Sequence, residues 1–154
     1  MARKIDARTE SWNRQRWQKE TLIVFQAMIR WEAAVDGWVQ CVTCGDKHVV
    51  ENTSLTMDAG HYAPRQFGRY AFDERNVHPQ CKRCNRPEAQ GGRAGATDEM
   101  YLFIRTVHGE EVAEELRQAK FAKTKAHPYS IVELQEMREE YRRRLKQAKD
   151  NNGQ

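Results

Sequence analysis

Apolar residues recur at helical spacing near the start of the chain. Between residues 11 and 35 there is no glycine or proline. The apolar positions are Leu22, Phe25, Met28, Ile29 and Ala33. Residues three and four apart share one face of a helix, so an amphipathic helix is predicted here. Gly37 is expected to end it, and the polar residues 1–10 are expected to fray. Four tryptophans surround this helix, and core packing is favoured over base stacking for them. They are Trp12, Trp17, Trp31 and Trp38.

The pattern changes to a shorter period after Gly37. Residues 38–62 alternate between apolar and polar side chains, which is typical of short strands. The candidate strand residues are Trp38, Val39 and Val42, then Val49-Val50, then Leu55-Thr56-Met57. Turns are expected at Cys44-Gly45-Asp46 and at residues 51–54, and residues 63–75 are expected to form a loop.

The last third of the chain returns to helical spacing. Thr97 is a candidate N-cap, and Gly109 is suited to end the helix that follows. The expected apolar face of that helix is Tyr101, Leu102, Ile104 and Val107. A second helix is predicted near 110–121, with Val112, Leu116 and Ala119 on one side, and Pro128 separates it from a third.

The final helix should begin at the capping-box pattern Ser130-Ile-Val-Glu133. Its apolar stripe is interpreted as a packing or dimer face, and consists of Ile131, Leu134, Met137, Tyr141 and Leu145. Its basic face is interpreted as solvated, with DNA contact as the alternative. That face consists of Arg138, Arg142, Arg143, Arg144, Lys146 and Lys149.

Length and composition fit one domain. The chain has 154 residues, 31% of them charged. Its apolar runs, such as residues 22–25, are far shorter than the ~20 residues of a membrane span. No secretory signal is visible at the start, so a cytoplasmic, reducing location is expected. In that setting the pairs Cys41-x-x-Cys44 and Cys81-x-x-Cys84 predict a closed, structural Cys₄ zinc site. A redox pair or unrelated buried cysteines explain the repeated spacing less well.

The positive charge is local. The net charge is +4, and residues 62–93 alone carry seven basic and three acidic side chains. A solvated loop is the alternative, but its place between the cysteine pairs favours phosphate contact. The candidate DNA-binding residues are Arg65, Arg69, Arg75, Lys82, Arg83 and Arg86.

The cysteine pairs are unusually far apart. An ordinary zinc ribbon has about 15–20 residues between its pairs, whereas 36 residues separate Cys44 from Cys81. This insert contains Asp58-Ala-Gly-His61-Tyr and ends in the run Asn76-Val-His78-Pro-Gln-Cys81-Lys-Arg-Cys84-Asn85. The order of His61, Asn76 and Asn85 resembles the HNH endonucleases that carry a Cys₄ zinc site. More narrowly, residues 40–145 resemble the phage NinG (Rap) recombination proteins.

The resemblance implies a fold and an activity. The expected fold is α+β, with a zinc-stapled ββα-metal core flanked by helices. The implied parts are an N-terminal helical arm (1–40), the nuclease core (41–93) and a C-terminal helical region (94–154), in one compact domain. The implied activity is structure-specific cleavage of branched DNA, including Holliday junctions and D-loops.

The residue chemistry is compatible with that activity. A neutral imidazole accepts a proton from water near pH 7, so His61 is the candidate general base. The resemblance implies that Asn76 holds the hairpin and orients this imidazole. Hard oxygen ligands suit Mg²⁺ or Mn²⁺, and Asn85 and Asp58 could supply them.

Several features depart from the usual HNH pattern. Most members have a metal ligand directly before the catalytic histidine, where this chain has Gly60. Asp58 should then point to the opposite strand face unless a bulge forms at Ala59-Gly60. Asp73 or His78 could replace Asp58 as a ligand. Pro87 limits where a helix after Cys84 can start. The remaining histidines are interpreted as surface residues: His48, His108 and His127.

Partners follow from the same hypothesis. Symmetric cutting of a four-way junction needs two cuts, so a homodimer is expected, built on the first or the last helix. The competing interpretations are a non-catalytic zinc module that binds nucleic acid and a zinc-stapled interaction protein.

Overall fold

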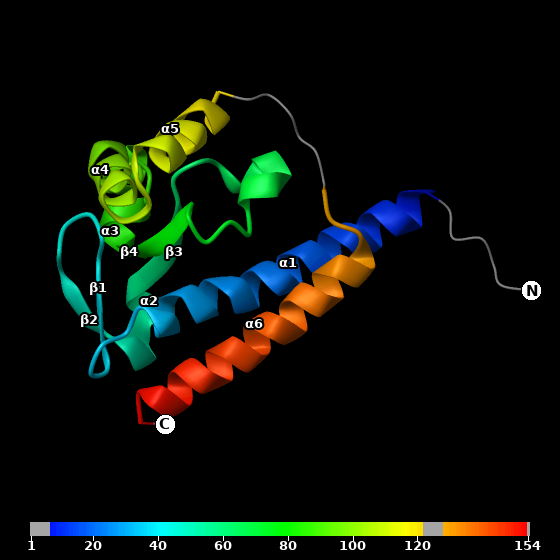
Figure 1. Ribbon diagram of the computed structural model, residues 1–154, viewed down its shortest axis with the longest axis horizontal. Helices are drawn as coiled ribbons and strands as arrows, with labels where there is room; N and C mark the ends of the chain where they lie inside the picture. The colour runs from blue at the N-terminus through cyan, green and yellow to red at the C-terminus, as the bar shows by residue number, and fades with distance from the viewer. Residues whose placement is uncertain (1–6, 122–127, 154) are drawn as a thin grey trace, which may run out of the picture.

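Two long helices form one side of the molecule. The computed structural model describes residues 7–121 and 128–153. Helices α1 (Ala7–Glu32) and α6 (Ile131–Asn151) lie side by side and run in the same direction (Figure 1). Residues 7–10 are helical, so the prediction that they fray is wrong, and residues 1–6 lie outside the described chain. Helix α1 ends at Glu32 because the chain then turns at Asp36 and Gly37, both with positive φ (50° and 79°).

The apolar stripe of α6 packs within the chain. Leu134 and Tyr141 are buried against Phe25 and Met28 of α1, and the Phe25 and Tyr141 ring centroids are 5.0 Å apart. The Thr21 hydroxyl donates to the Leu134 carbonyl oxygen over 3.0 Å. Burying each such side chain stabilises the fold by about 1.5–3 kcal/mol. This stripe is therefore a packing face within the chain.

The start of α6 follows the prediction. The Ser130 hydroxyl accepts from the Glu133 backbone N–H, and the Glu133 carboxylate accepts from the Ser130 N–H. Half of the basic face of α6 is exposed, as expected, and the other half packs on the protein. Arg144 forms ion pairs with Glu32 of α1 and with Glu74. Such pairs fix α6 against α1 and against the loop before β4.

Two small antiparallel sheets make up the β structure. β1 (Trp38–Gln40) pairs with β2 (Lys47–Val49), and β3 (Met57–His61) pairs with β4 (Val77–Cys81). The register of β3 and β4 is continuous from Met57 opposite Cys81 to His61 opposite Val77. The chain therefore has no bulge at Ala59-Gly60.

The predicted strand at Leu55-Thr56 is wrong. Val50–Asn52 forms a 3₁₀ turn (η1) and Thr53–Thr56 a single helical turn (α2). The Thr53 hydroxyl donates to the Val50 carbonyl and the Thr56 hydroxyl to the Asn52 carbonyl. These local bonds favour the turn, because a strand here would gain little from Leu55, which is 76% exposed. The predicted loop also contains a 3₁₀ helix, η2 (Arg65–Tyr70).

A second helical layer covers the other side of the β3–β4 hairpin (Figure 1). After β4 come α3 (Lys82–Asn85), η3 (Glu88–Gln90), α4 (Thr97–His108) and α5 (Glu110–Ala119). Gly109, with φ of 91°, ends α4 as predicted. Thr97 is not its N-cap, because Ala96 holds that position, with φ of 44° and no side-chain bond.

The buried face of α4 differs from the expected one. Met100 and Ile104 are buried with Leu116 of α5, whereas Leu102 and Val107 are 49% and 57% exposed. The overall architecture is mixed α+β, as expected. No helix within residues 7–121 and 128–153 is long and apolar enough to cross a membrane.

Candidate functional site

Four cysteines meet where the two hairpins join. Cys41 follows β1, Cys44 closes the next turn, Cys81 ends β4 and Cys84 lies in α3. Their sulfur atoms lie within 4.8 Å of one another, and Cys44 Sγ is 3.8 Å from Cys81 Sγ. A tetrahedral zinc ion with zinc–sulfur distances of about 2.3 Å holds its sulfurs about 3.8 Å apart. The cluster can therefore hold a metal ion such as zinc.

The surroundings of this cluster favour a thiolate at Cys41 and oppose one at Cys44. Burial opposes ionisation of Cys41, but the Thr43 hydroxyl and three backbone N–H groups outweigh it and lower its pKa to about 6. The Cys81 N–H lies 3.3 Å from Cys41 Sγ, and Arg93 Nη1 lies 3.6 Å from Cys84 Sγ. Burial raises the pKa of Cys44, so a bound cation is needed to hold all four sulfurs ionised.

An open cavity of about 760 Å³ reaches Asn85, the residue next to Cys84 of the cysteine cluster. Asp58 and His61 of β3 and Asn85 of α3 all line it. The structure thus brings together the candidate base and both candidate oxygen ligands. Asp58 lines the cavity although β3 has no bulge at Ala59-Gly60. The strong twist that is usual in two-stranded sheets can bring Asp58 and His61 to one cavity.

His61 is held in one orientation. Its Nε2 lies 3.0 Å from the Ala71 carbonyl oxygen. A carbonyl oxygen only accepts, so Nε2 carries the hydrogen and Nδ1 keeps its lone pair. Burial lowers the pKa of His61 below its usual 6.5, and the charge of Arg65 adds to this, while backbone hydrogen bonds with Ala71 and Ala59 oppose it. The ring is therefore neutral at pH 7, with one nitrogen able to accept a proton.

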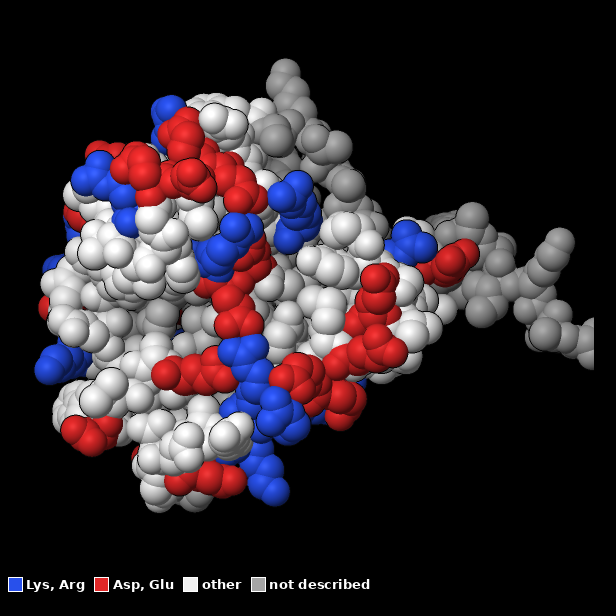
Figure 2. Space-filling model, viewed as in Figure 1, with Lys and Arg blue, Asp and Glu red and all other residues white. Residues whose placement is uncertain are grey.

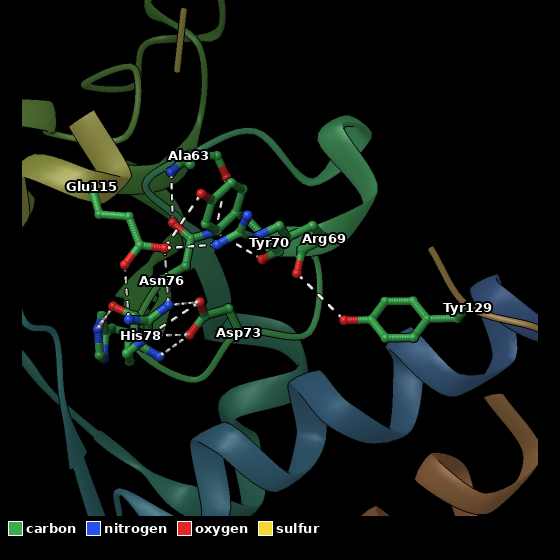
Figure 3. Close-up of polar contacts among 9 residues, drawn as sticks. Ala63, Arg69, Tyr70, Asp73, Asn76, His78, Glu115 and Tyr129 are labelled. Carbon is green, nitrogen blue, oxygen red and sulfur yellow. Dashed lines mark hydrogen bonds and ion pairs between the residues drawn. The ribbon is translucent and has the colours of Figure 1, made fainter. Parts of the chain in front are cut away.

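Asn76 organises the loop that holds His61. It is fully buried, and its amide donates to the Ala63 and Tyr70 carbonyls, both at 2.9 Å (Figure 3). Its Oδ1 accepts from the Ala63 N–H over 2.6 Å. Asn76 does not bond His61 directly. Asn76 acts through the backbone: it binds the Tyr70 carbonyl, and the next residue, Ala71, binds His61.

Asp58 orients Asn85. The Asn85 amide donates to Asp58 Oδ2 and Lys82 Nζ donates to Oδ1, both over 2.9 Å. The bond through Nδ2 leaves the Asn85 carbonyl oxygen as the end of the side chain that can accept or ligate. Each carboxylate oxygen of Asp58 also keeps a second lone pair.

Close packing explains why position 60 holds a glycine. A Cβ at this position would lie 2.2 Å from Gln80 Oε1 and 3.2 Å from Asn85 Oδ1. The buried Gln80 side chain donates to the Gly95 carbonyl over 2.5 Å, which ties β4 to the segment before α4. A side chain directly before His61 would therefore require the buried Gln80 to move.

The structure does not bring His78 or Asp73 to this cavity. His78 is buried between β4 and α4, with its ring centroid 4.8 Å from that of Phe103 and its Nε2 3.0 Å from the Arg75 carbonyl. Burial lowers its pKa to about 4. Asp73 is bound by Arg75 over 2.7 Å.

The other histidines differ from the expectation of surface residues. His48 and His108 are both half-buried, and His108 stacks on His78 with ring centroids 5.4 Å apart. His127 lies outside the described residues.

Most of the basic segment is paired with acids. Arg69 and Arg75 bind Glu115 of α5, 3.1 and 3.0 Å away (Figure 3). Three further pairs join this segment to acids outside it: Lys82 to Asp58, Arg83 to Asp46, and Arg93 to Glu99. On the face in view, acidic side chains gather over α4 and α5 (Figure 2). Within the described chain, Arg65 and Arg86 are the members of the candidate set that form no ion pair.

Two cavity residues were not predicted from the sequence. Gln26 and Arg30 of α1 line the same cavity as His61. Arg30 Nε is buried without a hydrogen-bond partner, and burial lowers the pKa of this arginine. The available signal was a polar pair four residues apart inside the apolar half of α1.

The comparisons with known proteins cover nearly the whole chain. A family described as "Bacteriophage Lambda NinG protein" matches residues 3–151. Protein ninG of Escherichia phage lambda is 28% identical over 136 residues, which are 88% of this chain and 58% of that protein. Protein ninG of Escherichia phage 933W is 27% identical over 136 residues, 88% of this chain and 59% of that protein. The chain thus spans less than two thirds of the length of these relatives. No solved structure matches it significantly. Because the family match extends over the helices, the cysteine cluster and the His61 cavity alike, the chain belongs to the NinG family.

Proposed function

We propose that this protein is a metal-dependent DNA endonuclease of the HNH type that cuts branched recombination intermediates such as Holliday junctions and D-loops. The observation that carries the proposal is the state of His61. Its Nε2–H is bound to Ala71, and the ring lies in the same open cavity as Asp58 and Asn85. A neutral imidazole in a cavity lined by oxygen ligands suits proton abstraction from water.

His61 is the general base in this proposal. Nδ1 takes the proton from the attacking water, while the Ala71 carbonyl stabilises the ring as it becomes positively charged. Asn76 is a positioning residue, since it fixes the loop that carries Ala71. The depressed pKa of His61 keeps the base in its active, neutral form at pH 7.

Asn85 and Asp58 are the proposed ligands of a catalytic Mg²⁺ or Mn²⁺. The Asn85 carbonyl oxygen and a free lone pair of the Asp58 carboxylate are donors of the hard type these ions prefer. When bound, such an ion would stabilise the charge that develops on the phosphate and the leaving oxygen. The four cysteines would hold a structural zinc that fixes α3, and so Asn85, against β3.

The test compares two histidine variants on linear, forked and four-way DNA with added Mg²⁺ or Mn²⁺. His61→Ala should bind these DNAs like the unsubstituted protein but cut them at least 100-fold more slowly. His48→Ala is the control, because His48 lies on β2 and does not line the cavity. Cleavage by His61→Ala at the unsubstituted rate would refute the assignment of the base.

A non-catalytic zinc module is the second candidate. It is favoured by one contact, because Lys82 Nζ already binds the Asp58 carboxylate that a catalytic cation would need. Binding without cleavage in Mg²⁺, Mn²⁺, Co²⁺ and Ni²⁺ would support this second function.

The nuclease proposal also includes a homodimer, since two symmetric cuts need two active sites. Light scattering with and without four-way DNA tests that component.

A further inference from the structure

One face of α1 forms a continuous wall beside the His61 cavity. A second open cavity, of about 650 Å³, shares Gln26 and Arg65 with the first. The α1 residues that line the two cavities recur every three or four positions and so form one stripe. They are Gln15, Gln18, Lys19, Leu22, Ile23, Gln26 and Arg30.

This stripe differs from the rest of α1 in its charge. The described acids of α1 lie outside the stripe, and each forms an ion pair. Glu10 pairs with Arg14, Glu20 with Arg16 and Arg138, and Glu32 with Arg144. The stripe itself carries Lys19 and Arg30, and Arg65 faces it from η2. Among the lining residues of both cavities, Asp58 is the one acid, and Lys82 already binds it.

Arg30 lies at the inner end of the stripe. It is half-buried beside the cavity, and its Nε has no hydrogen-bond partner. The charge of Asp58 acts on it, but no carboxylate of the described chain forms an ion pair with it. Burying a guanidinium nitrogen without a hydrogen-bond partner is costly. An incoming phosphate oxygen would satisfy it, because guanidinium groups bind phosphate with matched geometry. Lys19 and Arg65 are likewise without an ion pair among the described residues.

The remaining side chains of the stripe suit a nucleic-acid strand. Three glutamines offer amide groups to phosphates, sugars or base edges. Ile23 is 59% exposed and presents an apolar surface between them. From Gln15 to Arg30 the helix rises about 22 Å. A B-form strand advances about 3.4 Å per nucleotide, so the stripe matches six or seven nucleotides.

We infer that α1 is the DNA track of this protein: one strand of the substrate lies along the stripe and delivers its phosphate to His61. Lys19, Arg65 and Arg30 bind successive parts of the backbone, and Arg30 binds closest to the cleavage site. The paired arginines of residues 69–93 then shape the loop rather than bind DNA. This inference rests on the proposed DNA substrate but not on cleavage.

The experiment compares two triple variants with equal loss of charge. The first, Lys19→Gln/Arg65→Gln/Arg30→Gln, neutralises the track. The matched control, Arg142→Gln/Arg143→Gln/Lys146→Gln, neutralises three exposed cations of α6. Both are made in a His61→Ala background, and binding to fluorescent four-way DNA is measured without added divalent ions over a range of salt concentrations. Circular dichroism and zinc content establish that each variant is folded.

The track variant should bind more than tenfold more weakly than its parent at ~0.1 M salt. Its slope of log affinity against log salt should fall by about 2.7, since three phosphate contacts are lost. The α6 variant should keep at least three quarters of the parental slope. Lys19→Gln/Arg65→Gln, which leaves the half-buried Arg30 intact, should lose about 1.8 in slope and covers the case in which the triple variant fails to fold.

A second measurement locates the strand directly. A photoreactive benzoylphenylalanine at Gln18 should crosslink to DNA, whereas the same group at the exposed Gln135 of α6 should not. Equal affinities and slopes for the two triple variants, no crosslink at Gln18, or no DNA binding at all would each overturn the inference. DNA that binds through the track but is never cut would instead refute the nuclease proposal alone.

Discussion

Asn76 is predicted to stabilise the fold through three buried hydrogen bonds. Asn76→Ala leaves the Ala63 N–H, the Ala63 carbonyl and the Tyr70 carbonyl without their partner. A net contribution of about 0.5–1.5 kcal/mol per bond gives a loss of about 1.5–4.5 kcal/mol in the free energy of unfolding. The measurement is urea unfolding followed by circular dichroism, with zinc content held constant.

Asn76→Asp separates hydrogen bonding from packing. Its shape is nearly unchanged, but it loses both donors and turns a carboxylate oxygen toward two carbonyls. It should therefore destabilise the protein at least as much as Asn76→Ala. Asn152→Ala is the control, because that amide makes two bonds, to Gly37 and Ala148, at a half-buried position at the end of α6, and its loss should cost less than the loss of the three buried bonds of Asn76. Unchanged stability of Asn76→Asp would refute the reasoning.

Three further predictions concern the metal, pH and the α1–α6 contact. Cys81→Ser, or chelation of zinc, should lower the melting temperature measured by scanning calorimetry and reduce the zinc content from one ion per chain; an unchanged melting temperature after complete metal removal would contradict a structural role. Burial lowers the pKa of His78 to about 4, so on acidification the unfolded chain binds its proton first and stability falls between pH 6.5 and 4, by up to about 3 kcal/mol. Urea unfolding at pH 7 and pH 5 should show a flatter dependence in His78→Asn, and parallel profiles would exclude His78 as the cause. Arg144→Ala should destabilise by about 1–2 kcal/mol because it frees Glu32 and Glu74, whereas Arg142→Ala, which breaks an exposed pair with Glu139, should change unfolding by less than about 0.5 kcal/mol; equal effects would contradict the bridging role.

Local chemistry made several elements predictable. The capping box at Ser130 and the αL glycine at position 109 depend on residues within one helical turn, so their structural effect is visible in the sequence. The strand predicted at Leu55 failed because threonine hydroxyls bond the nearby backbone there. The helix start at Thr97 failed because the preceding turn places Ala96 at the cap.

The candidate site divides in the same way. The twofold C-x-x-C spacing and the order of His61, Asn76 and Asn85 are properties of the chain. They predicted the residues of the cysteine cluster and three of the residues at or near the cavity. The roles of Gly60 and Asn76 depended on contacts with Gln80, Ala63 and Tyr70, which come together only in the folded hairpin.

Charge shows most clearly what the sequence alone determined. The sequence determined that the net charge of +4 is concentrated in residues 62–93. Only the tertiary structure decided which of those charges are free, because Asp46, Asp58, Glu99 and Glu115 come from other parts of the chain and pair with them. It also decided that Arg30, a single charge within an apolar helix segment, lies beside His61. Coulombic pairing depends on distance in space, and distance along the chain does not report it.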